Sequence, residues 1–181
     1  MFHLGELILL LLLNGFGFGL AKNNYEVRLN KFQCDTPKGV YVNELNCILH
    51  RQSKPPLLSV RFNLNETIES FNMQLIFDLI KKDNSRLNVA DIKMDGCKYL
   101  SSYYETQFFG KFYKRIMAVS VLPKSCPIEA KKLFSIRNYT IIADDFPPGA
   151  PQSKWQMRLK VLNKMQLYAN VLFEGAVVYK T

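Results

Sequence analysis

The residues with the clearest chemistry in this chain are its four cysteines. The spacing of these cysteines includes no Cys-x-x-Cys pair, and His50 is the only histidine after residue 21, so zinc ligation is not expected. We therefore expect the four cysteines to form two disulfide bonds. Cys34 and Cys47 flank a predicted turn, whereas Cys97 and Cys126 stand at the two ends of a predicted helix, so we favour the pairs 34–47 and 97–126. A crossed pairing is the alternative.

Motifs for enzymatic chemistry are scarce. The sequence has no Gly-x-Ser-x-Gly motif, no glycine-rich phosphate loop and no His-Glu-x-x-His pair. A serine or cysteine nucleophile would need His50 as its base, and the neighbours of His50 indicate an ordinary strand-end residue. Asp144 and Asp145 are adjacent, so on a strand they would face opposite sides. We therefore expect a non-enzymatic protein with no catalytic residue, cofactor or metal.

The N-terminus indicates the compartment. The apolar run from Leu7 to Leu13 is too short to span a membrane, which takes roughly 20 residues. The run breaks at Asn14, and Gly19-Leu20-Ala21 is a small-x-small step, which together predict a secretory signal over residues 1–21. A buried N-terminal helix is the alternative. We expect a secreted, extracellular protein without a transmembrane segment in its mature chain, in a compartment where disulfides persist.

The mature chain, residues 22–181, suits a single domain. Its 160 residues (181 − 21) are enough to bury about 70% of the unfolded surface. Cleavage would keep all 24 Lys and Arg and 14 of the 15 acidic residues, which gives a net charge of +10. Nucleic acid is not an expected partner outside the cell. Anionic lipid, acidic glycans or an acidic protein face suit this charge better, and dispersed basic residues also promote solubility.

Most of the mature chain has the two-residue periodicity of β-strands. The clearest strand places Phe71, Met73, Leu75 and Phe77 on one face. A similar row begins at Trp155 and precedes a predicted hairpin loop at residues 163–164. Further strands are predicted over residues 25–34, with a bulge near residues 30–31, and over residues 40–49, 57–64 and 167–173.

One segment has helical periodicity instead. Between residues 100 and 119, large apolar side chains recur every four positions, which predicts one amphipathic helix of about five turns; they are Leu100, Tyr104, Phe108, Phe112 and Ile116. A single helix among strands, without strand–helix repetition, favours a mainly β fold. We expect an antiparallel β-sandwich or cup with one inserted amphipathic helix.

Two sequons for N-glycosylation are present, beginning at Asn65 and Asn138. Asn65 falls at a predicted turn, where a glycan is easily accommodated. An unbroken strand from Phe134 would instead put Asn138 on the inner face with Ile136. Either this strand begins after Arg137 or the second sequon is unused, and we favour the first.

The abundant apolar side chains allow two interpretations. The mature chain has 20 aromatic residues and five methionines, which could simply fill the core. If two sheets that normally pack about 10 Å apart are splayed, the same side chains would line a cavity suited to flexible hydrocarbon. The candidate ligand contacts are an inward row opposed by a second row, with Phe108 and Phe112 as a lid; the two rows are Phe71, Met73, Leu75 and Phe77, and Trp155, Met157 and Leu159.

The chain has five short motifs in this order: Gln33-Cys34, Asn46-Cys47, Asp95-Gly96-Cys97, Ser125-Cys126-Pro127 and Phe146-Pro147-Pro148-Gly149. In these motifs and their order it resembles a large insect family of secreted, mostly uncharacterised proteins. That family is similar to the CheB chemosensory proteins and, more distantly, to the ganglioside-activator and ML lipid-recognition proteins. The resemblance runs from about Tyr25 to Tyr179. It implies a β-sandwich or cup that binds lipids or pheromone-like hydrocarbons, with a chemosensory role. The alternative is a secreted protein with a solid core that binds an extracellular receptor or another protein.

Overall fold

The computed structural model describes residues 24–37, 41–105, 110–147 and 149–180. The predicted leader, residues 1–21, lies outside these ranges. Within them the chain is mainly β and forms two antiparallel sheets, as expected from the two-residue periodicity. No helix in the described ranges is long and apolar enough to cross a membrane.

The larger sheet has five strands in the order β1-β9-β8-β4-β5. In that order the strands are Tyr25–Asp35, Gln166–Tyr179, Lys154–Asn163, Asn72–Ile80 and Arg86–Asp95. The predicted bulge in β1 is confirmed, because the β1–β9 register shifts between Leu29 and Lys31. The β8–β9 loop lies one residue later than predicted: its residues are Lys164 and Met165, which both have positive φ, as a two-residue hairpin turn requires.

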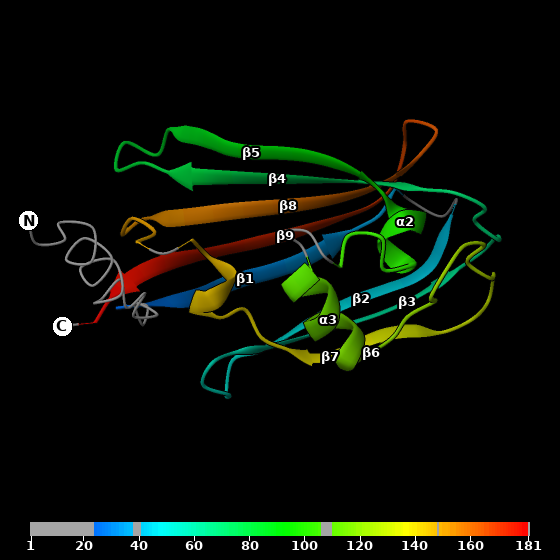
Figure 1. Ribbon diagram of the computed structural model, residues 1–181, viewed down its shortest axis with the longest axis horizontal. Helices are drawn as coiled ribbons and strands as arrows, with labels where there is room; N and C mark the ends of the chain where they lie inside the picture. The colour runs from blue at the N-terminus through cyan, green and yellow to red at the C-terminus, as the bar shows by residue number, and fades with distance from the viewer. Residues whose placement is uncertain (1–23, 38–40, 106–109, 148, 181) are drawn as a thin grey trace, which may run out of the picture.

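The smaller sheet has four strands in the order β2-β3-β7-β6. They are Val42–His50, Leu57–Leu64, Phe134–Tyr139 and Ser120–Val121. Figure 1 shows this sheet beside the larger one, with both helices in front of the sheets. A short 3-10 turn, η1 (Ala143–Asp145), follows β7 on the path to β8.

The predicted five-turn helix is wrong, because the segment forms two short helices, α2 (Gly96–Leu100) and α3 (Gly110–Ala118). The side chain of Asp95 caps α2 by accepting a hydrogen bond from the Lys98 amide at 3.0 Å. The chain then leaves the helical conformation, since Ser102 has a φ of +65°. The four-residue repeat of apolar side chains therefore serves two helices with different packing partners.

Buried apolar side chains gather in two separate clusters. The first surrounds Trp155 and includes Tyr25 and Val177. The second surrounds Phe71 and includes Leu100 and Tyr168. The core is therefore concentrated in two places instead of running evenly between the sheets.

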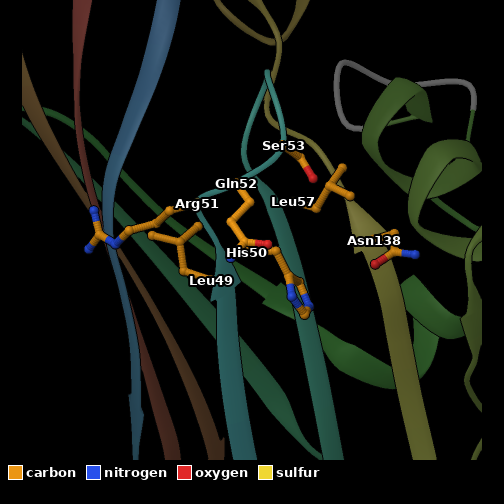
Figure 2. Close-up of a pocket in the computed structure, with 7 residues that line it drawn as sticks. All are labelled: Leu49, His50, Arg51, Gln52, Ser53, Leu57 and Asn138. Atoms are coloured by element: carbon orange, nitrogen blue, oxygen red, sulfur yellow. The ribbon is translucent and has the colours of Figure 1, made fainter.

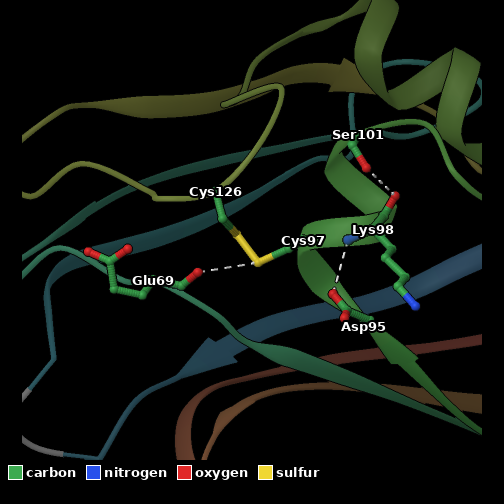
Figure 3. The surroundings of a disulfide bond; sticks show 6 residues. All are labelled: Glu69, Asp95, Cys97, Lys98, Ser101 and Cys126. Carbon is green, nitrogen blue, oxygen red and sulfur yellow. Dashed lines mark hydrogen bonds between the residues drawn. A yellow bond between two sulfur atoms is a disulfide. The ribbon is translucent and has the colours of Figure 1, made fainter.

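Both predicted disulfides are present. Cys34 of β1 pairs with Cys47 of β2 at a Cα–Cα distance of 5.8 Å, so this bond joins the two sheets. Cys97 of α2 pairs with Cys126 at 5.4 Å. Figure 3 shows the second bond beside the capped start of α2. Together the two bonds hold the first two strands to each other and the helical segment to the loop that carries Cys126.

Candidate ligand-binding face

The residues of the two rows predicted to contact ligand lie next to each other in one sheet. One row lies on β4, with Phe71 just before it, and the other lies on β8, and these two strands are neighbours in the larger sheet. In the register of these strands, Leu75 is opposite Leu159 and Phe77 is opposite Met157. The rows therefore lie side by side on one sheet, whereas the sequence suggested two rows facing each other. Strand order decides this, and strand order depends on contacts between segments far apart in the chain.

The side chains at the two ends of these rows pack on the two buried clusters, whereas Leu75 and Leu159 in the middle pack on neither. Trp155 is 1% exposed in the first cluster, and Phe71 is 8% exposed in the second. Met157 and Phe77 pack against the first cluster, and Met73 packs against the second. Leu75 and Leu159 lie between them, are half-buried, and are not among the side chains that pack on either cluster.

A third half-buried residue, on β5, continues the line of Leu159 and Leu75 across the sheet. Ile92 of β5 is opposite Leu75 and is half-buried as well. We call Ile92, Leu75 and Leu159 the middle row. Ile92 was not predicted from the sequence, because the β4–β5 register shifts between Phe77 and Asp78, and this bulge changes which residues of β5 face inward. The available signal in the sequence was the alternation of residues 90, 92 and 94 after the bulge.

The middle row can form only apolar contacts. Aliphatic side chains on adjacent strands stand about 5 Å apart and present a surface of methyl and methylene groups. Such a surface gains free energy when apolar area is removed from water, at roughly 25 cal/mol per Å². The three side chains of the middle row therefore offer apolar contact and carry no group for acid–base or nucleophilic catalysis.

The predicted lid is described only in part. Phe108 lies outside the described residues. Phe112 lies on α3 and is half-buried, and it is not among the side chains that pack on either cluster. A lid function for Phe112 therefore stays a prediction.

The position of α3 is held by one buried ionic contact. Arg115 of α3 pairs with Asp145 of η1, whose side chain is 3% exposed. The same guanidinium donates a hydrogen bond to the carbonyl of Thr140 at 2.5 Å and lies 5.0 Å from the centre of the Tyr139 ring. These contacts fix α3 against the end of β7 and the turn that follows it.

Two tyrosines near the helices have perturbed hydroxyls. Burial raises the pKa of Tyr99 to about 12, and the neighbouring Tyr113 adds to the shift. Burial also raises the pKa of Tyr139 far above its usual range, with a further contribution from the negative charge of Asp145. Both hydroxyls therefore stay protonated at neutral pH and cannot act as bases.

Two hollows in the described surface lie away from the candidate face. One, of about 490 Å³, adjoins the β2–β3 turn (Figure 2). The other, of about 690 Å³, lies between α2 and α3 and is lined by residues such as Leu100, Tyr113 and Met117. None of the eight predicted contact residues that the structure describes lines either hollow. Among the described residues, no three His, Cys, Asp or Glu side chains are grouped closely enough to hold a metal ion.

The fold and cysteines define a class: a mainly β protein of two antiparallel sheets with two disulfides. Within it, residues 71–157 match a family described as a protein of unknown function, DUF1091. The match spans 87 of the 181 residues, from β4 to the start of β8, and includes the Cys97–Cys126 bond. No curated protein is significantly similar to this chain.

Proposed function

We propose that this protein is a secreted, non-enzymatic binding protein for a hydrophobic ligand such as a lipid or a pheromone-like hydrocarbon. The observation that carries the proposal is the middle row, which is apolar and half-buried between two packed clusters. An apolar surface left partly exposed inside a fold commonly marks a binding site. A chemosensory role follows the resemblance of the cysteine motifs alone.

The energetics of the middle row favour an apolar occupant. Complete burial of a leucine or isoleucine side chain is worth about 1.5–3 kcal/mol. Leu75, Leu159 and Ile92 have already gained part of this on folding, and a bound hydrocarbon would supply the remainder. A flexible chain fits the site because its methylene groups can follow the pleat of the sheet.

The proposal of secretion is supported by the two disulfides. Disulfides persist in the extracellular space and are rare in reducing compartments. Expression of the full chain in a eukaryotic secretory cell, followed by N-terminal sequencing of the medium protein, tests this directly. We expect a mature chain that begins at Lys22. Retention inside the cell with residues 1–21 intact would contradict secretion.

The ligand is tested by native mass spectrometry of the secreted protein and by uptake of fatty acids and long-chain hydrocarbons after delipidation. Leu159→Asn should weaken uptake about tenfold, which corresponds to about 1.4 kcal/mol of lost contact. Lys160→Asn is the matched control, because the adjacent residue of β8 faces the other side of the sheet. Equal uptake by both variants, or no uptake by the wild-type protein, would exclude the middle row as the site.

A second function has one observation in its favour. Edge strand β5 carries Leu87 and Val89, which are 49% and 54% exposed. Exposed apolar residues on a free strand edge suit the addition of a strand from another protein. A secreted interaction protein with this edge as its contact is the alternative. It would be favoured if the delipidated protein takes up no ligand and Val89→Lys abolishes capture of an extracellular partner.

A further inference from the structure

We propose that Asn138 carries an N-linked glycan whose first sugar rests in the hollow beside the β2–β3 turn. This inference rests on the secretion part of the proposed function and goes beyond its ligand. The sequon Asn138-Tyr139-Thr140 supplies the acceptor sequence. The local conformation of β7 presents the acceptor side chain, and the hollow provides the contact surface.

A bulge in β7 turns Asn138 outward. Leu58 and Val60 of β3 are opposite Tyr139 and Ile136, so β7 has one extra residue in this interval. Asn138 has a φ of +55°, a conformation that asparagine tolerates better than most residues. Its amide donates a hydrogen bond to Ser59 Oγ at 3.2 Å. The prediction that this strand begins after Arg137 is therefore wrong, because the bulge reconciles an unbroken strand with an outward Asn138.

The burial of the neighbouring residues agrees with this change of face. Tyr139 is 8% exposed in the first cluster, whereas Asn138 is exposed. The fold can therefore accommodate a glycan on Asn138. In the transfer, the carboxamide nitrogen displaces a polyprenyl diphosphate from the anomeric carbon of an oligosaccharide donor. The new C–N bond forms as the C–O bond to the diphosphate breaks, and the nitrogen loses one proton. An oligosaccharide transferase of the secretory compartment would supply the donor.

The hollow next to Asn138 has the size and lining that a sugar ring needs. Its volume of about 490 Å³ lies in the range of small-molecule sites, roughly 300–1,000 Å³. Leu57 provides apolar surface for the C–H face of a pyranose, and His50 and Gln52 provide polar groups for its hydroxyls. Figure 2 shows Leu57 between the β2–β3 turn and Asn138 of β7, with His50 and Gln52 on β2 and the turn.

One hydroxyl connects the glycan site to the far side of the hollow. Ser59 Oγ, which accepts from the Asn138 amide, also lies 3.2 Å from Nε2 of His50. A sugar held in the hollow would contact the β2–β3 turn and be bonded to β7 at the same time. It would therefore restrain that turn against β7. Asn65 is the internal control, because it is exposed in the turn after β3 and is not among the residues that line this hollow.

The test uses the full chain secreted from glycosylating cells, with site occupancy measured by peptide mass spectrometry. We expect Asn138 to be occupied, and native enzymatic release of its glycan to be slower than release at Asn65. A contact worth about 1.4 kcal/mol would slow release about tenfold. Deglycosylated protein should show faster hydrogen exchange over residues 49–57. Asn65→Gln should leave that exchange unchanged.

Three outcomes separate the possible failures. If neither sequon is occupied and the leader is retained, secretion and this inference fail together. If Asn65 is occupied and Asn138 is empty, this inference alone fails. If Asn138 is occupied but its glycan is released as fast as that of Asn65, and hydrogen exchange over residues 49–57 does not change, the glycan does not bind in the hollow. Enzymatic release of the glycan also converts the Asn138 carboxamide to a carboxylate. Thr140→Val removes the sequon and leaves Asn138 unchanged. Hydrogen exchange of this variant over residues 49–57 therefore reports loss of the glycan alone.

Discussion

Replacing Gly175 with alanine tests how firmly the Trp155 end of the candidate face is packed. Gly175 lies on β9 between Leu29 of β1 and Trp155 of β8. A Cβ on Gly175 would lie 2.2 Å from the Arg28 carbonyl oxygen and 2.3 Å from Cζ2 of Trp155. Ordinary contacts of a Cβ begin at 3.4 Å, so both neighbours would have to move by about 1 Å.

Neither neighbour has room to move. Trp155 is 1% exposed, and Arg28 belongs to the paired β1 backbone. Overpacking costs about 1–3 kcal/mol, and two simultaneous clashes place this site at the upper end. Alanine restricts the unfolded chain and offsets about 0.5 kcal/mol. The expected net loss in the free energy of unfolding is about 2.5 kcal/mol, which lowers the thermal midpoint by about 5–10 °C.

The assay is urea and thermal unfolding of the G175A protein beside a matched G149A control. Gly149 has a φ of +72°, and no atom lies within 4 Å of the position that a Cβ would take, so alanine there costs only about 1 kcal/mol of conformational strain. The difference between the two variants isolates the steric contribution at Gly175. A G175A protein that is no less stable than G149A would refute the packing argument.

Three further predictions concern the segments that hold the helices. Replacing Cys97 and Cys126 together by serine should cost about 3.5 kcal/mol in the chain-entropy model and raise hydrogen exchange over residues 98–125, while unchanged exchange there would contradict a clamp. Arg115→Met leaves the buried Asp145 carboxylate without its guanidinium partner. Because the Arg115 side chain is 30% exposed, we expect the free energy of unfolding in urea to fall by only about 2 kcal/mol. A change near zero would show that the pair does not stabilise the fold. Because burial raises the pKa of Tyr99 from about 10 to about 12, its stabilising contribution is complete below about pH 10 and is lost as the pH rises through about 12. Tyr99→Phe should therefore lessen the alkaline loss of stability in urea titrations, and equal losses in both proteins would argue against this burial.

The strands were predictable because alternation is a local property of the sequence. Phe71, Met73, Leu75 and Phe77 alternate with other residues, and the structure places them in and just before β4. Both disulfides followed from the same local reasoning. The partner strand did not, because the pairing of β4 with β8 depends on contacts far apart in the chain. Leu75 and Leu159 of the middle row could therefore be predicted from the sequence, but their position side by side could not.

The prediction of one long helix failed for a related reason. Spacing of four predicts a continuous helix only if every apolar residue faces the same neighbour. A helix of that length would place Leu100 and Ile116 about 24 Å apart on one side. The structure places Leu100 in the second cluster and packs Ile116 against the first, with a turn after Leu100. Local spacing cannot reveal that two cores exist.

The Cys34–Cys47 disulfide makes the two edges of the five-stranded sheet unequal. Cys34 is opposite Val171, and Val171 is opposite Leu159, so the bond stands level with the middle row. At that level the β1 edge is covalently joined to the other sheet, whereas the β5 edge ends with Ile92. A long ligand lying across the sheet would thus have a direction: its inner end would stop at the disulfide, and any excess length would project past β5.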